Sequence, residues 1–266
     1  MGARHVVLAF EGQGATSIPG DPAIDLTALP PAAAQQAIIT HQLARARAAV
    51  VADADVTLVG VVGQSLGELS ALVTAGALAE DDALELARLR AELPAALLPE
   101  RPWTMASMTR LAPDRAEEAA TGLEVWVAGR NTPQDCIVVG ISSDFATFVE
   151  RLGAPPHTYR ELPVVAPYHT PAMAPVAEAL GKVVADLEVL EPVVPVVTPI
   201  GPGEVRTPDE ARAVVVAALT SPVAWSAALT VAAARWPDAA WRECGPSYSL
   251  HRFVWKNGLD LDWGEA

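Results

Sequence analysis

A serine between two glycines is the first feature of this sequence that could do chemistry. Gly63-Gln-Ser-Leu-Gly67 is a G-x-S-x-G pattern that follows an apolar run and precedes a segment with helical spacing. In that setting the glycines permit a tight turn, which presents the serine hydroxyl at the end of a strand. The pattern predicts that Ser65 is a nucleophile. The alternative interpretation is that Ser65 only caps the helix.

A serine hydroxyl is a weak nucleophile unless a base removes its proton, so a histidine must lie close to Ser65 in space. Four of the five histidines are explained more simply as surface or packing residues: His5, His41, His157 and His251. His169 differs because it lies in a loop bracketed by prolines, before a segment of helical composition. We therefore expect His169 to be the base.

These two residues need a scaffold, and the sequence predicts alternating strands and helices. Residues 5–10 and 56–62 are continuous apolar runs, typical of strands in a parallel sheet that is covered on both faces. Helices are expected within three segments, the last bent or ended by Pro94: 32–52, 63–78 and 80–97. The turn at Ser65 therefore joins a strand to a helix.

The middle of the chain has a different texture. It consists of short pieces that predict strands over 104–108, 124–127 and 136–139 and helices over 113–120 and 142–152. We expect a small α+β insertion of about 65 residues. The predicted organisation is a catalytic domain of residues 1–98 and 164–266, interrupted by a small domain of residues 99–163.

The composition excludes several classes of protein. Of the 266 residues 51% are hydrophobic and 19% charged, which predicts a folded chain, and the net charge of −14 argues against nucleic acid as a partner. No apolar run approaches the roughly 20 residues that cross a bilayer, and the apolar stretch before Glu11 has only five residues, too few for a secretory signal. We expect a cytoplasmic location and no membrane partner. Cys136 and Cys244 form no C-x-x-C motif, so no disulfide framework and no metal site are expected.

Six short blocks span almost the whole chain. They are Phe10-Glu-Gly-Gln-Gly14, Gly63-Gln-Ser-Leu-Gly-Glu68, Ala128-Gly-Arg-Asn-Thr-Pro133, Pro167-Tyr-His-Thr-Pro-Ala-Met173, Leu219-Thr-Ser-Pro-Val-Ala-Trp225 and Glu243-Cys-Gly-Pro246. In type and order they resemble the blocks of the malonyl-CoA:acyl-carrier-protein transacylase and polyketide-synthase acyltransferase family. The resemblance implies an α/β-hydrolase-like large domain with a parallel sheet and a ferredoxin-like insertion.

The resemblance also implies a ping-pong acyl transfer from coenzyme A, through an acyl-serine, to the phosphopantetheine of an acyl carrier protein, with no bound cofactor. Ser65 is then the nucleophile and His169 the base and later the acid. The backbone N–H groups of Gln13 and Leu66 correspond to the oxyanion hole of the family.

An arginine that pairs with the carboxylate of malonyl-type groups in the family falls on Arg90. The alternative is that Arg90 is an exposed helix residue paired with Glu85 or Glu92. The matching blocks place four further positions at the substrate pocket: Gln64, Asn131, Tyr168 and Ala218.

Several positions depart from the pattern of the family. Glu11 replaces a proline, Ala15 a serine, Gln64 a histidine and Ala218 a glutamine, and the segment 15–62 is shorter than usual. The residues Ala166-Pro-Tyr-His169 match neither the pattern associated with malonyl nor that with methylmalonyl selection. The identity of the acyl group therefore stays open.

The partner is expected to be an acyl carrier protein, which is usually acidic, and like charges discourage encounter. Residues 98–163 carry only −3 of the net charge. Arg110, Arg130 and Arg160 are candidates for a docking patch there; the alternative is dispersed surface charge. Two other functions remain open on the same scaffold: a hydrolase that removes wrong acyl groups from carrier proteins, and a degenerate protein that only docks.

Overall fold

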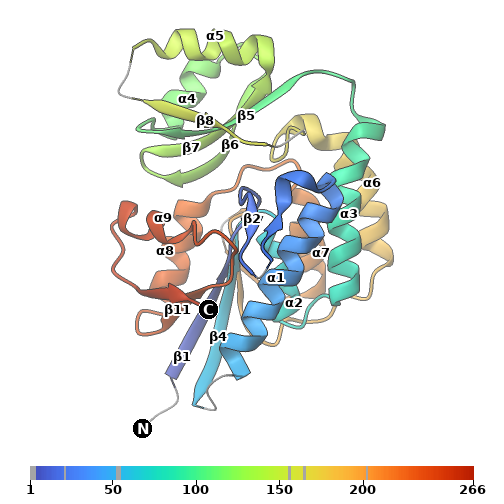
Figure 1. Ribbon diagram of the computed structural model, residues 1–266, viewed down its shortest axis with the longest axis vertical. Coiled ribbons are helices and arrows are strands. Elements are labelled where there is room, and N and C mark those ends of the chain that lie inside the picture. Colours follow the sequence, from blue (N-terminus) through green and yellow to red (C-terminus); the bar gives the residue numbers. More distant parts are fainter. Residues whose placement is uncertain (1–3, 21, 52–54, 155–156, 164–165, 202) are drawn as a thin grey trace.

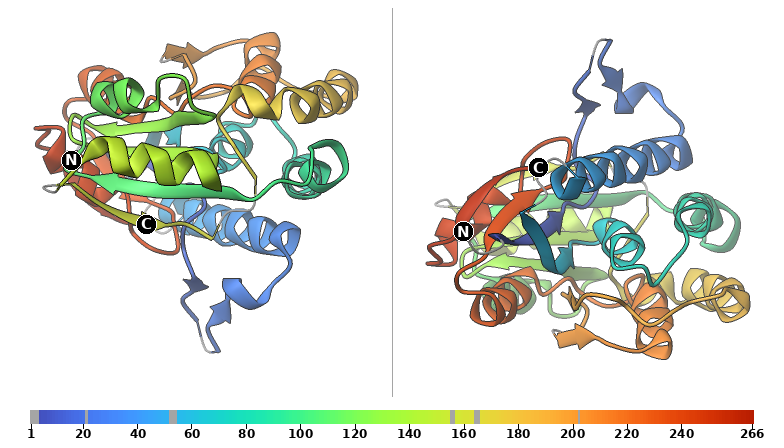
Figure 2. Two further views of the ribbon diagram at one scale, coloured as in Figure 1. Left: turned by 90° about the horizontal axis from the view of Figure 1, so that it is seen from above. Right: turned by 90° about the horizontal axis from the view of Figure 1, so that it is seen from below.

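Two sheets organise the molecule, one above the other in Figure 1. The computed structural model describes residues 4–20, 22–51, 55–154, 157–163, 166–201 and 203–266. A six-stranded sheet has the order β10-β9-β4-β1-β11-β12, and a four-stranded sheet the order β6-β7-β5-β8. A hairpin of β2 (Ser17–Ile18) and β3 (Ile24–Asp25) projects beyond the body of the molecule in Figure 2.

The six-stranded sheet is built around β1 (Arg4–Phe10). This strand lies between β4 (Val56–Gly63) and β11 (Ala240–Glu243) and is parallel to both. β9 (Val196–Thr198) and β12 (Asp262–Glu265) extend the sheet in parallel, and β10 (Gly203–Val205) is antiparallel at one edge. The predicted mixed α/β fold and its first two strands are confirmed.

Alternate side chains of β1 enter two different apolar cores, as the period of two of a strand requires. Val6, Leu8 and Phe10 pack into the core on one face, whereas Val7 and Ala9 pack into the core on the other. The first face is covered by α1 (Pro31–Val51), α2 (Gly67–Thr74), α3 (Glu80–Leu97), α6 (Ala174–Asp186) and α7 (Pro208–Ala217), with the short 3-10 helices η1 (Leu26–Ala28) and η2 (Pro171–Met173). The second face is covered by α8 (Trp225–Arg235) and α9 (His251–Lys256). Of the helices described here, none combines the length and apolarity needed to span a bilayer.

The helix predictions hold, and the structure excludes one of the two effects expected of Pro94. α1 and α3 match the expected segments, although the predicted end at Ala52 lies outside the described residues. Pro94 does not end α3, which continues to Leu97. Proline has no N–H for the carbonyl of Arg90 one turn earlier. The hydroxyl of Tyr168 donates to that carbonyl instead, at 2.9 Å.

The four-stranded sheet is antiparallel and occupies the predicted insertion. Its elements are, in chain order, β5 (Trp103–Thr109), α4 (Pro113–Ala120), β6 (Val125–Thr132), β7 (Asp135–Ile141), α5 (Ser142–Leu152) and β8 (Thr158–Glu161). One face packs against α4 and α5 through a cluster that includes Phe145 and Phe148. From the other face, Met105 and Val139 join the core of the larger sheet.

Backbone hydrogen bonds connect the small sheet to the chain that precedes α8. The N–H of Val223 donates to the carbonyl of Ala128 at 2.9 Å, and the N–H of Arg130 donates to the carbonyl of Val223 at 2.8 Å. Two of the six sequence blocks therefore meet each other directly.

Candidate active site

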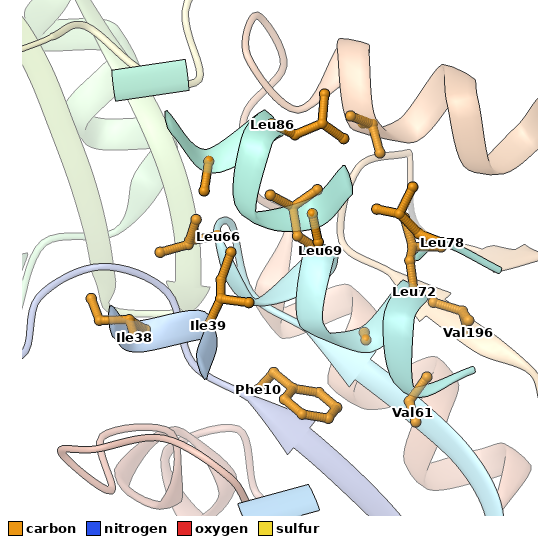
Figure 3. Close-up of a cluster of buried hydrophobic side chains, with 14 of the residues drawn as sticks. Phe10, Ile38, Ile39, Val61, Leu66, Leu69, Leu72, Leu78, Leu86 and Val196 are labelled. Carbon is orange, nitrogen blue, oxygen red and sulfur yellow. The ribbon is translucent and has the colours of Figure 1, made fainter. Parts of the chain in front are cut away.

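Ser65 lies on a sharp turn between β4 and α2, with a φ of 55° that is unusual for a residue with a side chain. The flanking glycines have a steric cause. A Cβ on Gly63 would lie 2.5 Å from the Gly67 carbonyl oxygen, and a Cβ on Gly67 would lie 2.4 Å from the carbonyl oxygen of Phe10. Leu66 anchors the turn in the core beside Ile39 and Leu69, as Figure 3 shows.

The hydroxyl of Ser65 meets the imidazole of His169. The Ser65 Oγ to His169 Nε2 distance is 2.6 Å, although the two residues are 104 positions apart in the chain. His169 is 7% exposed and also has a positive φ, of 66°. The backbone N–H of His169 donates to the carbonyl of Leu219 at 2.8 Å, which holds the loop that carries His169 in place. The geometry allows the imidazole to take the hydroxyl proton.

The environment keeps His169 neutral. Burial, and next the positive charge of Arg90, lower the pKa of His169 to about 3. The backbone carbonyls of Ala218 and Ser221 oppose this shift. Nδ1 of His169 has no partner at hydrogen-bond geometry among the described residues. At neutral pH Nε2 is therefore free to accept a proton.

Arg90 reaches the same hydroxyl from α3. Its Nη2 donates to Ser65 Oγ at 3.0 Å, and its guanidinium lies 4.8 Å from the centre of the Tyr168 ring. The side chain is buried, and no carboxylate among the described residues forms an ion pair with it. The alternative sequence interpretation is wrong, because Glu85 and Glu92 both pair with Arg88. Burial lowers the pKa of Arg90, against the opposing influence of Tyr168 and Glu68.

A buried carboxyl group lies close to Arg90. Oε1 of Glu68 accepts a hydrogen bond from the Thr198 hydroxyl at 2.5 Å, while Glu68 Oε2 and Arg90 Nε have no partner among the described residues. Burial raises the pKa of Glu68 to about 8, opposed by Thr198 and Arg90. Both side chains line a cavity of about 20 Å³ together with Ser65 and Ala218.

The main cavity has a volume of about 430 Å³ and is lined by Ser65, Arg90 and His169. Five other residues predicted from the sequence line it too: Gln13, Gln64, Asn131, Tyr168 and Arg160. Gln64 donates to the Asn131 side-chain oxygen at 3.2 Å, which closes one part of the wall. Ala218 is also predicted to contact the substrate, but it lines the smaller cavity instead.

The three arginines predicted as a docking patch do not share one setting. Arg160 lines the main cavity, but Arg110 and Arg130 are not among the residues that line it. Arg130 on β6 forms ion pairs with Asp114 and Glu117 of α4 at 2.8 and 2.6 Å, so two carboxylates already offset its charge.

The sequence analysis missed several residues of the main cavity, and four of them show where these residues come from. Met105 and Ile137 enter from the small sheet, and Tyr248 and Arg252 from the segment after β11. No motif marks them, because their approach depends on how the two sheets pack. Burial, and next the positive charge of Arg160, lower the pKa of Arg252. The two arginines therefore lie near each other at the cavity.

Comparison with known proteins identifies the family of this chain. Residues 32–241 match the family model described as "Acyl transferase domain". The chain is 31% identical over 199 residues to the malonyl CoA-acyl carrier protein transacylase of Escherichia coli strain K12, covering 71% of this chain and 63% of that protein. It is 30% identical over 186 residues to the non-reducing polyketide synthase pks27 of Aspergillus flavus, covering 70% of this chain but only 9% of that one. The chain thus spans less than two thirds of either relative.

Solved structures show the same fold. The acyltransferase domain of the iterative polyketide synthase in enediyne biosynthesis has a TM-score of 0.79 and 33% identity, covering 100% of this chain and 67% of that one. A malonyl-transacylase in complex with a type II polyketide-synthase acyl-carrier protein has a TM-score of 0.86 at 22% identity, covering 98% and 96%. The resemblance seen in six short blocks is thereby confirmed, and the chain belongs to the acyl transferase domain family.

Proposed function

We propose that the protein transfers an acyl group from a coenzyme A thioester, through an ester on Ser65, to the phosphopantetheine thiol of an acyl carrier protein. The observation that carries the proposal is Ser65 Oγ held between His169 Nε2 at 2.6 Å and Arg90 Nη2 at 3.0 Å. Coenzyme A and phosphopantetheine are substrates in this reaction and not resident cofactors.

The chemistry follows from these contacts. His169 takes the Ser65 proton while Oγ attacks the thioester carbonyl, and the carbon–sulfur bond breaks as the imidazolium returns the proton to the departing thiolate. The incoming thiol of the carrier reverses these steps and frees the hydroxyl. The backbone N–H groups of Gln13 and Leu66 are proposed to stabilise the oxyanion, since Gln13 lines the cavity and Leu66 follows the nucleophile.

We propose a malonyl-type acyl group, because Arg90 is a buried cation without a carboxylate partner among the described residues. A planar guanidinium can hold a carboxylate with two parallel hydrogen bonds. Gln64, Asn131 and Tyr168 line the same cavity, and we propose that they also contact the substrate.

We also propose the finer classification of the two sheets. The order β6-β7-β5-β8 with two helices on one face supports a ferredoxin-like small domain over residues 99–163. The strand–turn–helix at Ser65 in a largely parallel sheet supports an α/β-hydrolase-like large domain over 1–98 and 164–266, whose boundary residues 1 and 164 lie outside the described residues.

Intact-mass measurement after incubation with acyl-coenzyme A thioesters tests the proposal. We expect the wild-type protein to gain one acyl group, Ser65→Ala to gain none, and His169→Ala to react roughly 10² to 10⁴ times more slowly. Arg90→Ala should lose malonyl transfer far more than acetyl transfer, whereas Arg88→Ala on the same helix should change neither.

The same experiment separates the competing functions. An acyl group that persists until carrier protein is added supports transfer. Rapid loss to water without carrier protein supports the hydrolase, and a wild-type protein that never acquires an adduct supports the degenerate docking protein. Equal losses of malonyl and acetyl transfer in Arg90→Ala would refute the role of Arg90.

A further inference from the structure

Glu11 is a buried carboxylate at the end of β1, where the resembled family has a proline. It accepts four hydrogen bonds from one loop. Ser247 donates its backbone N–H to Oε1 at 2.8 Å and its hydroxyl to Oε2 at 2.6 Å. Ser249 donates its backbone N–H and hydroxyl to Oε2 at 3.3 and 2.6 Å. These three residues are called the Glu11 clamp below.

The Glu11 clamp connects this loop to a residue whose own backbone is held by helices α1 and α2. The Glu11 carbonyl accepts a hydrogen bond from Gln42 of α1 at 2.7 Å, and the Gln42 amide oxygen accepts one from Ser70 of α2 at 2.7 Å. The loop also passes close to the carboxylate, since a Cβ on Gly245 would lie 2.2 Å from Glu11 Cδ. Helices behind the nucleophile thus hold the backbone of Glu11, and its side chain holds the loop.

The clamped loop is a wall of the main cavity. Ser247, Tyr248 and Ser249 all line the cavity that contains Ser65. Tyr248 has a φ of 50°, a left-handed conformation that disfavours residues with a side chain. It lies between the two serines that bind Glu11, so the clamp acts on both sides of the strained residue.

We propose that Glu11 is a positioning residue that holds Tyr248 and the loop 247–249 as a wall of the thioester channel, and so sets the affinity for the coenzyme A or phosphopantetheine arm. The inference rests on the proposed function, since it takes the cavity to be that channel. A carboxylate is required because Oε2 faces three donors. The amide of a glutamine would direct N–H groups at the backbone N–H of Ser249.

Glu11→Gln tests the proposal, with Glu210→Gln as the matched control. Glu210 also accepts backbone N–H groups, from Arg206 and Thr207 at 2.7 and 3.0 Å, but it caps α7 and does not line the main cavity. We expect Glu11→Gln to weaken the binding of free coenzyme A, measured by calorimetry, about 10-fold. The rate of Ser65 modification by phenylmethanesulfonyl fluoride should stay within about two-fold of wild type, because this small reagent needs the nucleophile but not the channel wall. Glu210→Gln should change neither.

Ser249→Ala gives a second test should Glu11→Gln fail to fold, and we expect a smaller loss of coenzyme A affinity from it. An unchanged affinity in the folded variants overturns the proposal, as does an equal loss of affinity and of sulfonylation, which would indicate general damage. A wild-type protein that binds no coenzyme A also overturns it. If the wild type binds coenzyme A but acquires no acyl group, the proposed function fails while the comparison of affinities still decides the role of Glu11.

Discussion

At the scale of single residues, Arg90 acts on both Ser65 and His169, the proposed nucleophile and base. Its guanidinium donates to Ser65 Oγ, and its charge helps to lower the pKa of His169. A cation near an imidazole disfavours the imidazolium, so Arg90 favours the neutral base before any substrate arrives. A bound carboxylate would offset this charge, so the substrate itself would make the imidazolium easier to form.

This coupling predicts the pH dependence of Ser65 reactivity. His169 is an effective base only above its own pKa, which is lowered to about 3, so the acid limb should lie well below the usual 6.5 for histidine. Arg90→Ala removes one cause of the shift, and the limb should move to higher pH. The measurement is the rate of sulfonylation by phenylmethanesulfonyl fluoride, an uncharged reagent, between pH 2.5 and 8, a range that includes the expected limb. Arg88→Ala is the control, and an identical acid limb in Arg90→Ala would contradict the coupling.

At the scale of elements, Pro94 and Tyr168 form one unit. The proline interrupts the hydrogen bonds of α3 at the carbonyl of Arg90, and the Tyr168 hydroxyl takes up that carbonyl at 2.9 Å. The Tyr168 ring also packs on the Arg90 guanidinium. One side chain therefore holds both ends of Arg90.

A double-mutant cycle tests this unit. We expect Tyr168→Phe to lower the free energy of unfolding by about 1 to 2 kcal/mol, because a buried carbonyl loses its partner. In a Pro94→Ala background the new N–H at position 94 can donate to the Arg90 carbonyl. Tyr168→Phe should therefore lower the free energy of unfolding by less in that background. Denaturant unfolding measures both, with the exposed Tyr159→Phe as control. Equal costs in the two backgrounds would show that the interrupted helix is not the reason for the tyrosine.

At the scale of the whole molecule, two exposed arginines line the main cavity of an acidic chain. Arg160 of β8 and Arg252 of α9 both line the main cavity. We propose that they attract the phosphate of the carrier's arm and the acidic carrier itself. This narrows the predicted docking patch to Arg160 and adds Arg252.

Charge reversal tests the proposed role of these two arginines. Arg160→Glu and Arg252→Glu should each raise the Michaelis constant for the carrier protein roughly 3- to 10-fold and weaken its dependence on salt. Arg110→Glu, which alters an exposed arginine that is not among the residues lining the cavity, should have little effect. If all three variants behave alike, only the net charge matters and no local patch exists.

The sequence could predict the parts of this site that local geometry dictates. The turn at Ser65 requires glycine at positions 63 and 67, so the pattern of small residues predicts the turn. The first two strands are apolar because both of their faces are buried, so their composition predicts the sheet. The approach of Met105, Tyr248 and Arg252 depends on packing between distant elements, which leaves no local pattern. Whether Pro94 ends α3 could not be decided from local sequence, because the partner that takes up the free carbonyl, Tyr168, lies 74 positions further along the chain.

The backbone bonds between Val223 and strand β6 have a consequence for building chimeras. The carbonyl of Leu219 accepts a hydrogen bond from the backbone N–H of His169, the proposed base. The same short stretch, residues 219–223, is therefore hydrogen-bonded both to β6 and to His169. A chimera that exchanges only residues 99–163 would pair the β6 strand of one relative with the Val223 segment of another, at the place where these backbone hydrogen bonds form. An exchange of substrate preference between relatives should therefore carry residues 219–223 along with the small sheet.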